Sequence, residues 1–328
     1  MDKKVTIGVL LTLIFGFATP DYWFGSSKPE YLTQVSESLL LPAEENRNQL
    51  PQEEEVSLIF VGDMMFSRGV AKKIKANNDF NYPFLKVRDY LKTADIVFGN
   101  LETAIAPARK IQEGKMVFRA DPQIAQALKG AGFSIVSLAN NHTPNFGEQG
   151  LKNTFKYLTE AGVKYVGAGA DGEQAYQPVY VETSGIKFAF LAYNSSDVVP
   201  LSYQAKEDHC GTAFMDIEKM VKRVKEAKQN ADFVIVSMHV GDEYKEQPNQ
   251  FQVNFAHNVI DAGAELVIGH HPHVIQKAEK YKDKYIFYSL GNFIFDQRWQ
   301  KTKEGLIIKV LFDRKGVVKI EPSAILIE

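Results

Sequence analysis

The chain has very little cysteine and almost no net charge. Cys210 is the only cysteine among 328 residues, which excludes an intrachain disulfide and a metal site built from several thiolates. The formal charge of −2 at pH 7 gives no electrostatic reason to expect a nucleic-acid partner. The scarcity of cysteine is compatible with an exported bacterial protein, because many such proteins avoid this residue.

Two other features are missing. The sequence contains no GxxxxGK[ST] motif, so ATP-dependent ligation of a polymer by this chain alone is not expected. It also shows no internal repeat. With 45% hydrophobic and 24% charged residues, the composition is that of an ordinary globular protein, large enough for one big domain or two smaller ones.

The first 24 residues have the pattern of a membrane segment. Lys3 and Lys4 precede an apolar run over residues 5–18, and residues 22–24 are aromatic, as in interfacial anchors. Together these residues reach the roughly 20 that a bilayer requires. We expect residues 1–24 to be an uncleaved signal anchor, in preference to a cleaved signal peptide. The basic residues predict a single pass through the cell membrane, with the bulk of the chain outside the cytoplasm.

A change of composition separates this segment from the rest of the chain. Residues 25–55 are rich in Ser, Pro, Gln, Asn and Glu and end in an acidic run. Such a segment buries too little apolar area to offset its ordering entropy, so a flexible linker is expected. From residue 56 onward, apolar strand-like runs alternate with amphipathic helix-like ones, and the end of the chain is rich in strands. This pattern predicts an α/β domain over residues 56–328, with a mostly parallel core extended by antiparallel strands in layers.

The individual elements follow from hydrophobic periodicity and from capping residues. Helices are predicted at residues 82–92, 122–131 with Asp121 as N-cap, 148–161, 216–228 and 250–263. Strands are predicted at residues 56–61, 96–98, 134–138, 165–166, 233–237, 266–268, 285–288, 305–312 and 317–327. Residues 179–182 and 187–192 are expected to form a hairpin that turns at Ser184 and Gly185.

The most informative stretch is residues 266–275, LVIGHHPHVI. His270, His271 and His273 follow an apolar run and Gly269, and a buried strand of this kind delivers polar side chains to the edge of a sheet. An extended backbone would point His271 and His273 to the same side. Three histidines at one strand end predict a metal or catalytic site, against the alternative of a loop that happens to be rich in histidine.

Four other predicted strands also end in polar groups. They lead into Asp63, into Asn100 and Glu102, into residues 140–142, and into residues 239–243. One such end is explained by capping of the next helix, but five together are not. Oxygen and nitrogen donors without sulfur suit Mn, Zn, Fe or Mg, and their number exceeds what one ion needs. The sequence therefore predicts two divalent metal ions, the arrangement that hydrolyses phosphate esters.

Six segments carry a family resemblance. In order, they are FVGDMMFSRG, FGNLETAI, SLANNHTPNFGEQGL, MHVGDEY, IGHHPHVIQ and YSLGNFIFD. They resemble the motifs of the CapA family of poly-γ-glutamate capsule biosynthesis proteins, which are similar in fold to calcineurin-like metallophosphatases. The resemblance extends over about residues 56–296. It implies a layered α/β/β/α fold with mixed sheets.

The resemblance also implies the ligands of the two ions. They are Asp63, Glu102, Asn141, His239, His271 and His273. Asp63 and His273 would belong to the first ion, Glu102 would bridge the pair, and the other three would hold the second ion. The metal ions themselves are divalent, with Mn, Zn, Fe and Mg left open.

Further residues have roles implied by the same resemblance. His142 would face the substrate as a general acid or as a hydrogen-bond donor to the transition state. Arg68 would clamp an anionic substrate through its planar guanidinium, with a surface salt bridge as the alternative. His270 is left for a supporting or substrate-facing role. Asn292 either lines the site or forms a turn, and the turn is the favoured interpretation.

Some positions depart from the family pattern. Met65 stands where a phosphatase has a histidine, which leaves the first ion one ligand short. Asn145 stands where the family has Asp, and a neutral amide stabilises the imidazolium of His142 less than a carboxylate does. Glu243 either compensates with a further carboxylate or supports the site indirectly. These departures weaken the expectation of phosphatase activity.

Two functions remain open at this stage. One is a membrane-anchored two-metal hydrolase that acts on a phosphorylated or amide-linked anionic substrate. The other is a non-catalytic, metal-stabilised component of poly-γ-glutamate capsule synthesis or export, which binds the anionic polymer or the membrane subunits of the capsule synthetase. These partners are implied by the family resemblance alone.

Overall fold

The computed structural model describes residues 55–107 and 116–328. Its first sheet contains β1 (Val56–Met64), β2 (Ile96–Leu101), β5 (Ile135–Ser137), β6 (Lys164–Val166), β15 (Asn292–Ile294), β16 (Glu304–Asp313) and β17 (Gly316–Leu326). The strand order is β17-β16-β1-β2-β5-β6, and β15 also pairs with β1. β1, β2, β5, β6 and β15 are parallel, whereas β16 and β17 extend the sheet antiparallel.

The second sheet repeats this plan. It contains β8 (Val179–Thr183), β9 (Ile186–Asn194), β11 (Phe233–His239), β12 (Leu266–His270), β13 (Ala278–Tyr281) and β14 (Lys284–Phe287), in the order β13-β14-β12-β11-β9-β8. Its four central strands are parallel and its two edge strands are antiparallel. Two short pairs join β3 (Ala104–Ile105) to β4 (Arg119–Ala120) and β7 (Ala168–Gly169) to β10 (Gly211–Thr212). The predicted parallel core with antiparallel extensions is confirmed.

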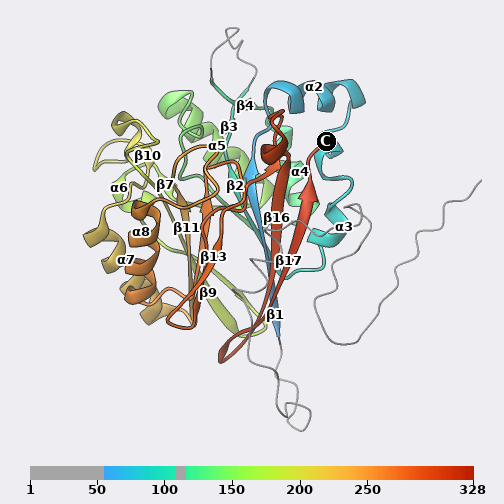
Figure 1. Ribbon diagram of the computed structural model, residues 1–328. Helices are drawn as coiled ribbons and strands as arrows, with labels where there is room; N and C mark the ends of the chain where they lie inside the picture. The colour runs from blue at the N-terminus through green and yellow to red at the C-terminus, as the bar shows by residue number, and fades with distance from the viewer. Residues whose placement is uncertain (1–54, 108–115) are drawn as a thin grey trace, which may run out of the picture.

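Helices cover the outer faces of both sheets (Figure 1). They are α2 (Arg68–Asn77), α3 (Arg88–Leu91), α4 (Gln123–Ala131), α5 (Gly147–Ala161), α6 (Gly172–Ala175), α7 (Ile217–Asn230) and α8 (Gln250–Ala262), with 3-10 turns η1 (Tyr82–Phe84), η2 (Leu201–Tyr203) and η3 (Gln300–Lys303). Apolar side chains of α2 to α5 pack on the first sheet, and those of α7 and α8 pack on the second. A third apolar cluster lies between the two sheets.

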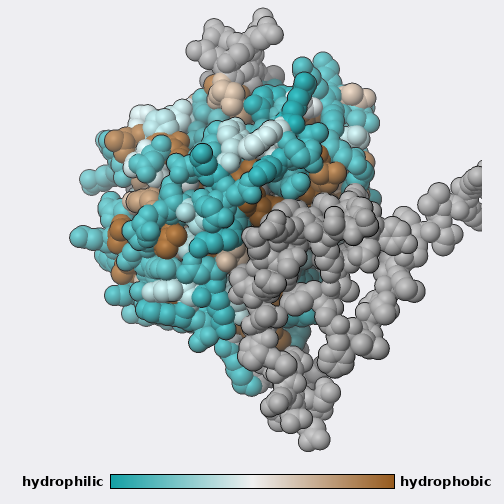
Figure 2. Space-filling model, viewed as in Figure 1, coloured by the Kyte–Doolittle hydropathy of each residue, from teal (hydrophilic) through white to brown (hydrophobic). Residues whose placement is uncertain are grey.

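The inter-sheet cluster explains why the strands read as nearly continuous apolar runs. A sheet covered on both faces has no solvated side, so its strands do not alternate between apolar and polar residues. Phe98 of β2 stacks on Phe190 of β9 with ring centroids 5.6 Å apart, which joins the two sheets directly. Burial of each such ring contributes on the order of 2 kcal/mol. The outer surface seen in Figure 2 is mainly hydrophilic, with separate apolar areas.

One predicted helix differs from the structure, and helix α2 was not predicted. The helix expected over residues 82–92 is divided into η1 and α3, because Phe84 packs against Phe66 and Phe133 and the chain tightens into i→i+3 hydrogen bonds there. Helix α2 was not predicted, since it starts directly after the first strand-end motif. It buries Val70 and Ile74, one turn apart, against the first sheet.

The boundaries of the other predicted helices and strands agree with the structure to within a few residues, including the hairpin of β8 and β9. The expected signal anchor and residues 25–54 of the expected linker lie outside the described residues. Within residues 55–107 and 116–328, no helix is long and apolar enough to cross a bilayer.

Candidate metal centre

Each sheet contributes a row of polar residues to the same end of the molecule. In the first sheet, Asp63 is in register with Asn292 on one side and Asn100 on the other. In the second, His239 is in register with His270. Residues paired across parallel strands project on the same face. The Asn100 Nδ2 atom lies 2.8 Å from Asp63 Oδ1 and 3.3 Å from His239 Nδ1, so the two rows face each other.

A buried cluster of three side chains forms the centre of the site. Ligand atoms of Asp63, Glu102 and His239 all lie within 4.8 Å of one another, and none of the three is more than 1% exposed. Neither carboxylate oxygen of Glu102 has a hydrogen-bond partner among the described residues. Buried polar groups are almost always satisfied, so an unpartnered carboxylate here needs a partner such as a cation. Burial and the charge of Asp63 raise the pKa of Glu102 well above its usual value.

The three side chains expected to hold the second ion lie together. Asn141 Oδ1 is 3.1 Å from His239 Nε2, and the His239 and His271 rings have centroids 4.8 Å apart. Burial, with the charge of neighbouring histidines, lowers the pKa of His239 and lowers that of His271 to about 3. Both imidazoles are therefore neutral at pH 7, the form that binds a metal ion.

His273 lies on the other side of Glu102. Its Nδ1 atom is 3.0 Å from Asn292 Oδ1 and 3.3 Å from Asp63 Oδ2, and its Nε2 atom is 3.9 Å from Glu102 Oε1. Although burial lowers it, the negative charges of Glu102 and Asp63 raise the pKa of His273 to about 9. The metal-free site thus places a protonated imidazole beside its carboxylates. A divalent ion would replace that positive charge.

Asn292 fixes the orientation of His273. The Asn292 amide nitrogen donates to Gln297 Oε1 at 3.0 Å and to the Thr302 carbonyl at 2.9 Å, so its oxygen must accept from His273 Nδ1. This leaves Nε2 of His273 directed toward Glu102, where it could bind a metal ion. The favoured expectation of a turn-forming Asn292 is wrong, because the left-handed backbone in this turn belongs to Gly291, with φ of 68°.

The turn that carries the histidines is held in a strained backbone conformation. His271 and His273 have φ angles of 98° and 57°, a region that residues with a Cβ rarely adopt. The backbone N–H of His271 donates to Asp63 Oδ2 at 3.1 Å and helps to hold this geometry. Such strain is concentrated at functional sites, where the surrounding structure compensates for it.

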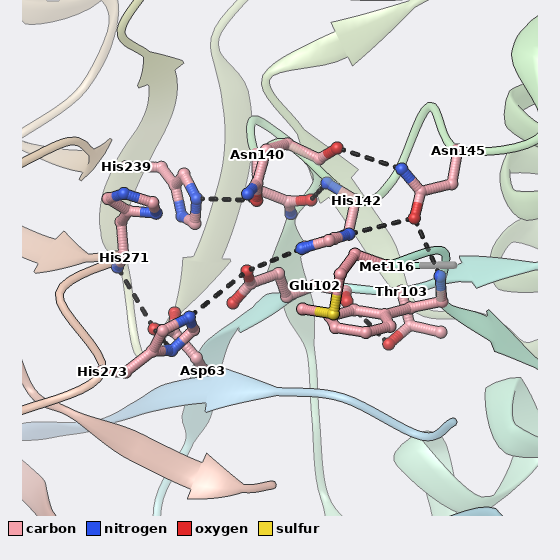
Figure 3. Close-up of polar contacts among 12 residues, drawn as sticks. Asp63, Glu102, Thr103, Met116, Asn140, His142, Asn145, His239, His271 and His273 are labelled. Carbon is pink, nitrogen blue, oxygen red and sulfur yellow. Dashed lines mark hydrogen bonds and ion pairs between the residues drawn. The ribbon is translucent and has the colours of Figure 1, made fainter. Parts of the chain in front are cut away.

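His142 lies between the carboxylate cluster and Asn145 (Figure 3). Its Nδ1 atom is 3.0 Å from Asn145 Oδ1, which also accepts the Phe118 N–H at 2.8 Å, and its Nε2 atom is 3.9 Å from Glu102 Oε1. The Asn145 oxygen can only accept, so the Nδ1 atom of His142 carries a proton. Burial lowers the pKa of His142 to about 4, although the bond to Asn145 opposes this change.

A ladder of asparagines supports these residues, and sequence reasoning gave it no role. Asn140 Nδ2 donates to Asn100 Oδ1 at 3.0 Å, while Asn140 Oδ1 accepts the backbone N–H of His142 at 3.0 Å and that of Thr143 at 2.8 Å. Asn140 therefore fixes the turn that presents Asn141 and His142. Its place at a strand end was the only signal in the sequence, and capping explains such a residue equally well.

Asn194, at the end of β9, was not predicted as a site residue. It is in register with His239, is fully buried, and neither atom of its amide has a hydrogen-bond partner among the described residues. It extends the polar row of the second sheet by one strand. A sixth polar strand exit was the signal that could have identified it.

Two positions bear on the first ion. Met65 is fully buried and its sulfur accepts the Ser67 N–H at 2.9 Å, so it supplies no ligand. His270 is also fully buried, and its Nδ1 atom is 3.4 Å from Asp63 Oδ1. In the part of the chain that the structure describes, neither of its ring nitrogens has a hydrogen bond of good geometry. This burial agrees with a supporting role for His270 and not with a substrate-facing one.

Arg68 and Glu243 differ from the simplest expectations for them. The Arg68 guanidinium pairs with Asp296 and lies 4.6 Å from the centroid of the Phe118 ring, so it is not a free anion clamp. Glu243 is exposed and is not one of the three buried residues whose ligand atoms lie together, Asp63, Glu102 and His239.

Comparisons with known proteins identify the family. The model of the family "Bacterial capsule synthesis protein PGA_cap" matches residues 57–297. The capsule biosynthesis protein CapA of Bacillus anthracis is 36% identical over 270 residues, covering 79% of this chain and 64% of that protein. The PGA biosynthesis protein CapA of Bacillus subtilis (strain 168) is 29% identical over 324 residues, covering 98% of this chain and 79% of that protein. The chain thus spans less than two thirds of the length of the B. anthracis relative.

Solved structures support the fold assignment. The calcineurin-like phosphoesterase YfkN from B. subtilis matches with a TM-score of 0.53 and 14% identity, over 84% of this chain and 91% of that one. A sulfate thiohydrolase, SoxB, from Thermus thermophilus matches with a TM-score of 0.51 and 9% identity, over 85% of this chain and 58% of that one. At these identities the likeness concerns the fold alone. The chain belongs to the bacterial capsule synthesis protein PGA_cap family of CapA relatives and has a metallophosphatase-like fold.

Proposed function

We propose that this protein is a two-metal hydrolase of poly-γ-glutamate capsule synthesis or export, acting on a phosphorylated or amide-linked anionic substrate. The observation that carries the proposal is the carboxylate of Glu102. It is fully buried, has no hydrogen-bond partner within residues 55–107 and 116–328, and lies 3.9 Å from imidazole nitrogens of both His142 and His273. Two cations held beside Glu102 would satisfy both of its oxygens.

The donor set fits divalent ions such as Mn, Zn, Fe or Mg. Asp63 and His273 would hold the first ion, and Asn141, His239 and His271 the second, with Glu102 shared between them. A bound pair of this kind supplies an activated water and neutralises the charge that develops on the substrate. His270, beside Asp63, supports the first ligand from the protein side.

His142 is placed to handle a proton. Its Nδ1–H is held by Asn145, so Nε2 is the atom that gains or loses a proton on the side of Glu102. Stacking on Phe118, with ring centroids 3.8 Å apart, fixes the plane of the imidazole. Protonated His142 would donate to the leaving group, and neutral His142 would accept from an attacking water. Arg68 contributes positive charge at the same side once a substrate anion competes with Asp296.

A non-catalytic role is favoured by one observation. Asn145 gives His142 no compensating charge, and the pKa of about 4 leaves little imidazolium at neutral pH. In that case the metal ions would stabilise a domain that binds the capsule polymer or the membrane subunits of its synthetase. A relative in Mycobacterium tuberculosis, 32% identical over 248 residues, is described as a probable polyglutamine synthesis accessory protein. Co-purification with synthetase subunits that survives His142→Ala would support this alternative.

The proposed location is the cell membrane, with the α/β domain outside the cytoplasm. Lys3, Lys4 and the apolar run that follows them support an N-terminal anchor. Membrane fractionation, with and without residues 1–24, tests it. Recovery of the full-length chain in the soluble fraction would contradict the anchor.

Elemental analysis of the purified full-length chain tests the hydrolase. We expect about two equivalents of transition metal and hydrolysis of an aryl phosphate. His142→Ala should abolish hydrolysis with its metal content unchanged, while His209→Ala, an exposed histidine away from the site, should retain both. A chain that binds no metal, and whose thermal stability chelator leaves unchanged, would overturn the proposal.

A further inference from the structure

Two aromatic side chains form an exposed corner beside the metal centre. Tyr244 is 41% exposed and Trp299 is 50% exposed. Their ring centroids are 5.6 Å apart and their planes meet at 85°, so the rings form two walls of a right angle. Tyr244 follows β11, and Trp299 lies between β15 and η3. Exposed apolar rings that lie next to a polar site are typical of a binding surface.

The position of Tyr244 is fixed by the histidine turn. Its backbone N–H donates to the Pro272 carbonyl at 2.9 Å, and its ring centroid is 6.3 Å from that of His273. Its φ angle is 64°, a strained value for a bulky residue. Such strain persists only where surrounding contacts over-determine it, and it is concentrated at ligand-binding and active sites.

A chain of hydrogen bonds connects the corner to the metal centre. His273 Nδ1 donates to Asn292 Oδ1 at 3.0 Å, Asn292 Nδ2 donates to Gln297 Oε1 at 3.0 Å, and Gln297 Nε2 donates to the Tyr244 hydroxyl at 3.3 Å. These three hydrogen bonds connect His273, a candidate metal ligand, to the exposed side chain of Tyr244 without interruption. A group held at the corner would lie next to a group bound at the metals.

The charges around the corner limit what it binds. Lys301 pairs with Glu246, which leaves the exposed carboxylate of Glu243, next to Tyr244 in the chain, as an acceptor for the hydroxyl groups of a ligand. Two apolar walls at a right angle match a sugar ring, whose C–H faces pack on aromatic rings while its hydroxyls donate to Glu243 and Tyr244.

We propose that Tyr244 and Trp299 form a subsite for the sugar ring of a glycosyl phosphate whose phosphoryl group lies at the metal centre. The phosphoryl half of this assignment rests on the proposed hydrolase function, whereas the sugar half rests on the corner. Trp299 is the main contact, and Asn292 and Gln297 are positioning residues that align the two halves.

The subsite is tested by isothermal titration calorimetry, which measures the affinity of the metal-loaded full-length chain for three probes. The probes are two phosphonates that cannot be hydrolysed, one carrying a glucosamine ring and one carrying a glycerol chain, together with inorganic phosphate. The ring should bind about 5-fold more tightly than the glycerol chain, the gain expected of one aromatic contact. Trp299→Ala should remove this preference while its metal content and its affinity for inorganic phosphate stay unchanged. Tyr82→Ala, which removes a 37% exposed ring elsewhere, should retain it.

Several outcomes overturn the subsite. They are equal affinity for the two phosphonates, a preference that survives Trp299→Ala, and tighter binding of a nucleoside phosphonate than of the glucosamine one. If no phosphonate or phosphate binds, the hydrolase function fails and the corner is tested alone with methyl N-acetylglucosaminide. That neutral sugar should then shift the indole N–H resonance of Trp299 and leave that of Trp23 unchanged. No shift at Trp299 would overturn the proposal.

Discussion

Asp63 and Asn292 lie in register on the neighbouring parallel strands β1 and β15, and both contact the same nitrogen of His273. The two strands are more than 200 residues apart in the sequence. Their pairing joins the first polar strand end to the last motif of the chain and sets the imidazole between them. The orientation of a candidate ligand of the first ion therefore depends on strand register.

Replacement of Asn292 by alanine should weaken binding of the first ion. Without the acceptor at its Nδ1 atom, His273 is free to rotate and to change tautomer. Loss of such a support lowers metal affinity by about 10- to 100-fold. Metal titration should show one site weakened and the other unchanged, and Asn258→Ala on the outer helix α8 should alter neither. Equal weakening of both sites would contradict this assignment.

Glu102→Gln should remove the stabilisation that metal gives. When the free metal concentration is 100 times its dissociation constant, metal binding stabilises the wild type by about 3 kcal/mol. This stabilisation appears as a rise in Tm on metal addition. The variant cannot bridge two ions, so its Tm should not respond. Glu265→Gln, which alters another buried glutamate whose partner is Lys284, should lower Tm but keep the response. A full response in Glu102→Gln would exclude the bridge.

Asn145→Asp should raise the pKa of His142. In the metal-free wild type, His142 should titrate near pH 4, because burial disfavours the imidazolium and the amide offers no charge. A carboxylate at this position, 3.0 Å from Nδ1, should raise the pKa by about 2 pH units. NMR titration of the His142 ring protons measures it. Unchanged titration would show that Asn145 does not control the protonation of His142.

Metal binding should release protons below pH 9. His273 has a pKa of about 9 in the metal-free chain, so it is protonated at pH 7.5 and must lose its proton to bind a metal ion. Its raised pKa also means that its stabilising charge in the metal-free fold is present below its ordinary pKa and is lost as the pH rises through 9. Calorimetry in buffers of different ionisation enthalpy should detect about one proton or more per chain. No release at pH 7.5 would show that His273 is not a ligand.

Gly62→Ala should disrupt the site through the backbone. A Cβ at this position would lie 1.9 Å from the Gly291 carbonyl oxygen, which accepts the Asp63 N–H at 3.0 Å. We expect loss of metal binding and a lower yield of folded protein. Gly130→Ala in helix α4, where a Cβ meets only Asn81 at 3.7 Å, should instead stabilise the fold by about 0.5 kcal/mol. Normal metal content in Gly62→Ala would contradict this account.

Local patterns predicted most of the elements, and the resemblance to the CapA family implied the candidate ligands. Apolar runs such as those of β11 and β12 are strands whatever they pair with, and the polar residues that end them are recognisable in the sequence. The prediction of one helix over residues 82–92 was wrong, because the packing of Phe84 against Phe66 and Phe133 outweighed the helical periodicity of the apolar residues. Helix α2 was not predicted because its amphipathic pattern begins at Arg68, within the motif that was interpreted as part of the metal site.

The sequence by itself determined that Asp63, Glu102 and the histidines end strands, because hydrophobic periodicity is a local property of the chain. Only the tertiary structure decided that Asn100 joins the two polar rows, that Asn292 orients His273, and that Tyr244 and Trp299 meet beside the centre. These relations depend on strand register and on the packing of two sheets. Both are set by contacts between residues far apart in the sequence, which no local pattern encodes.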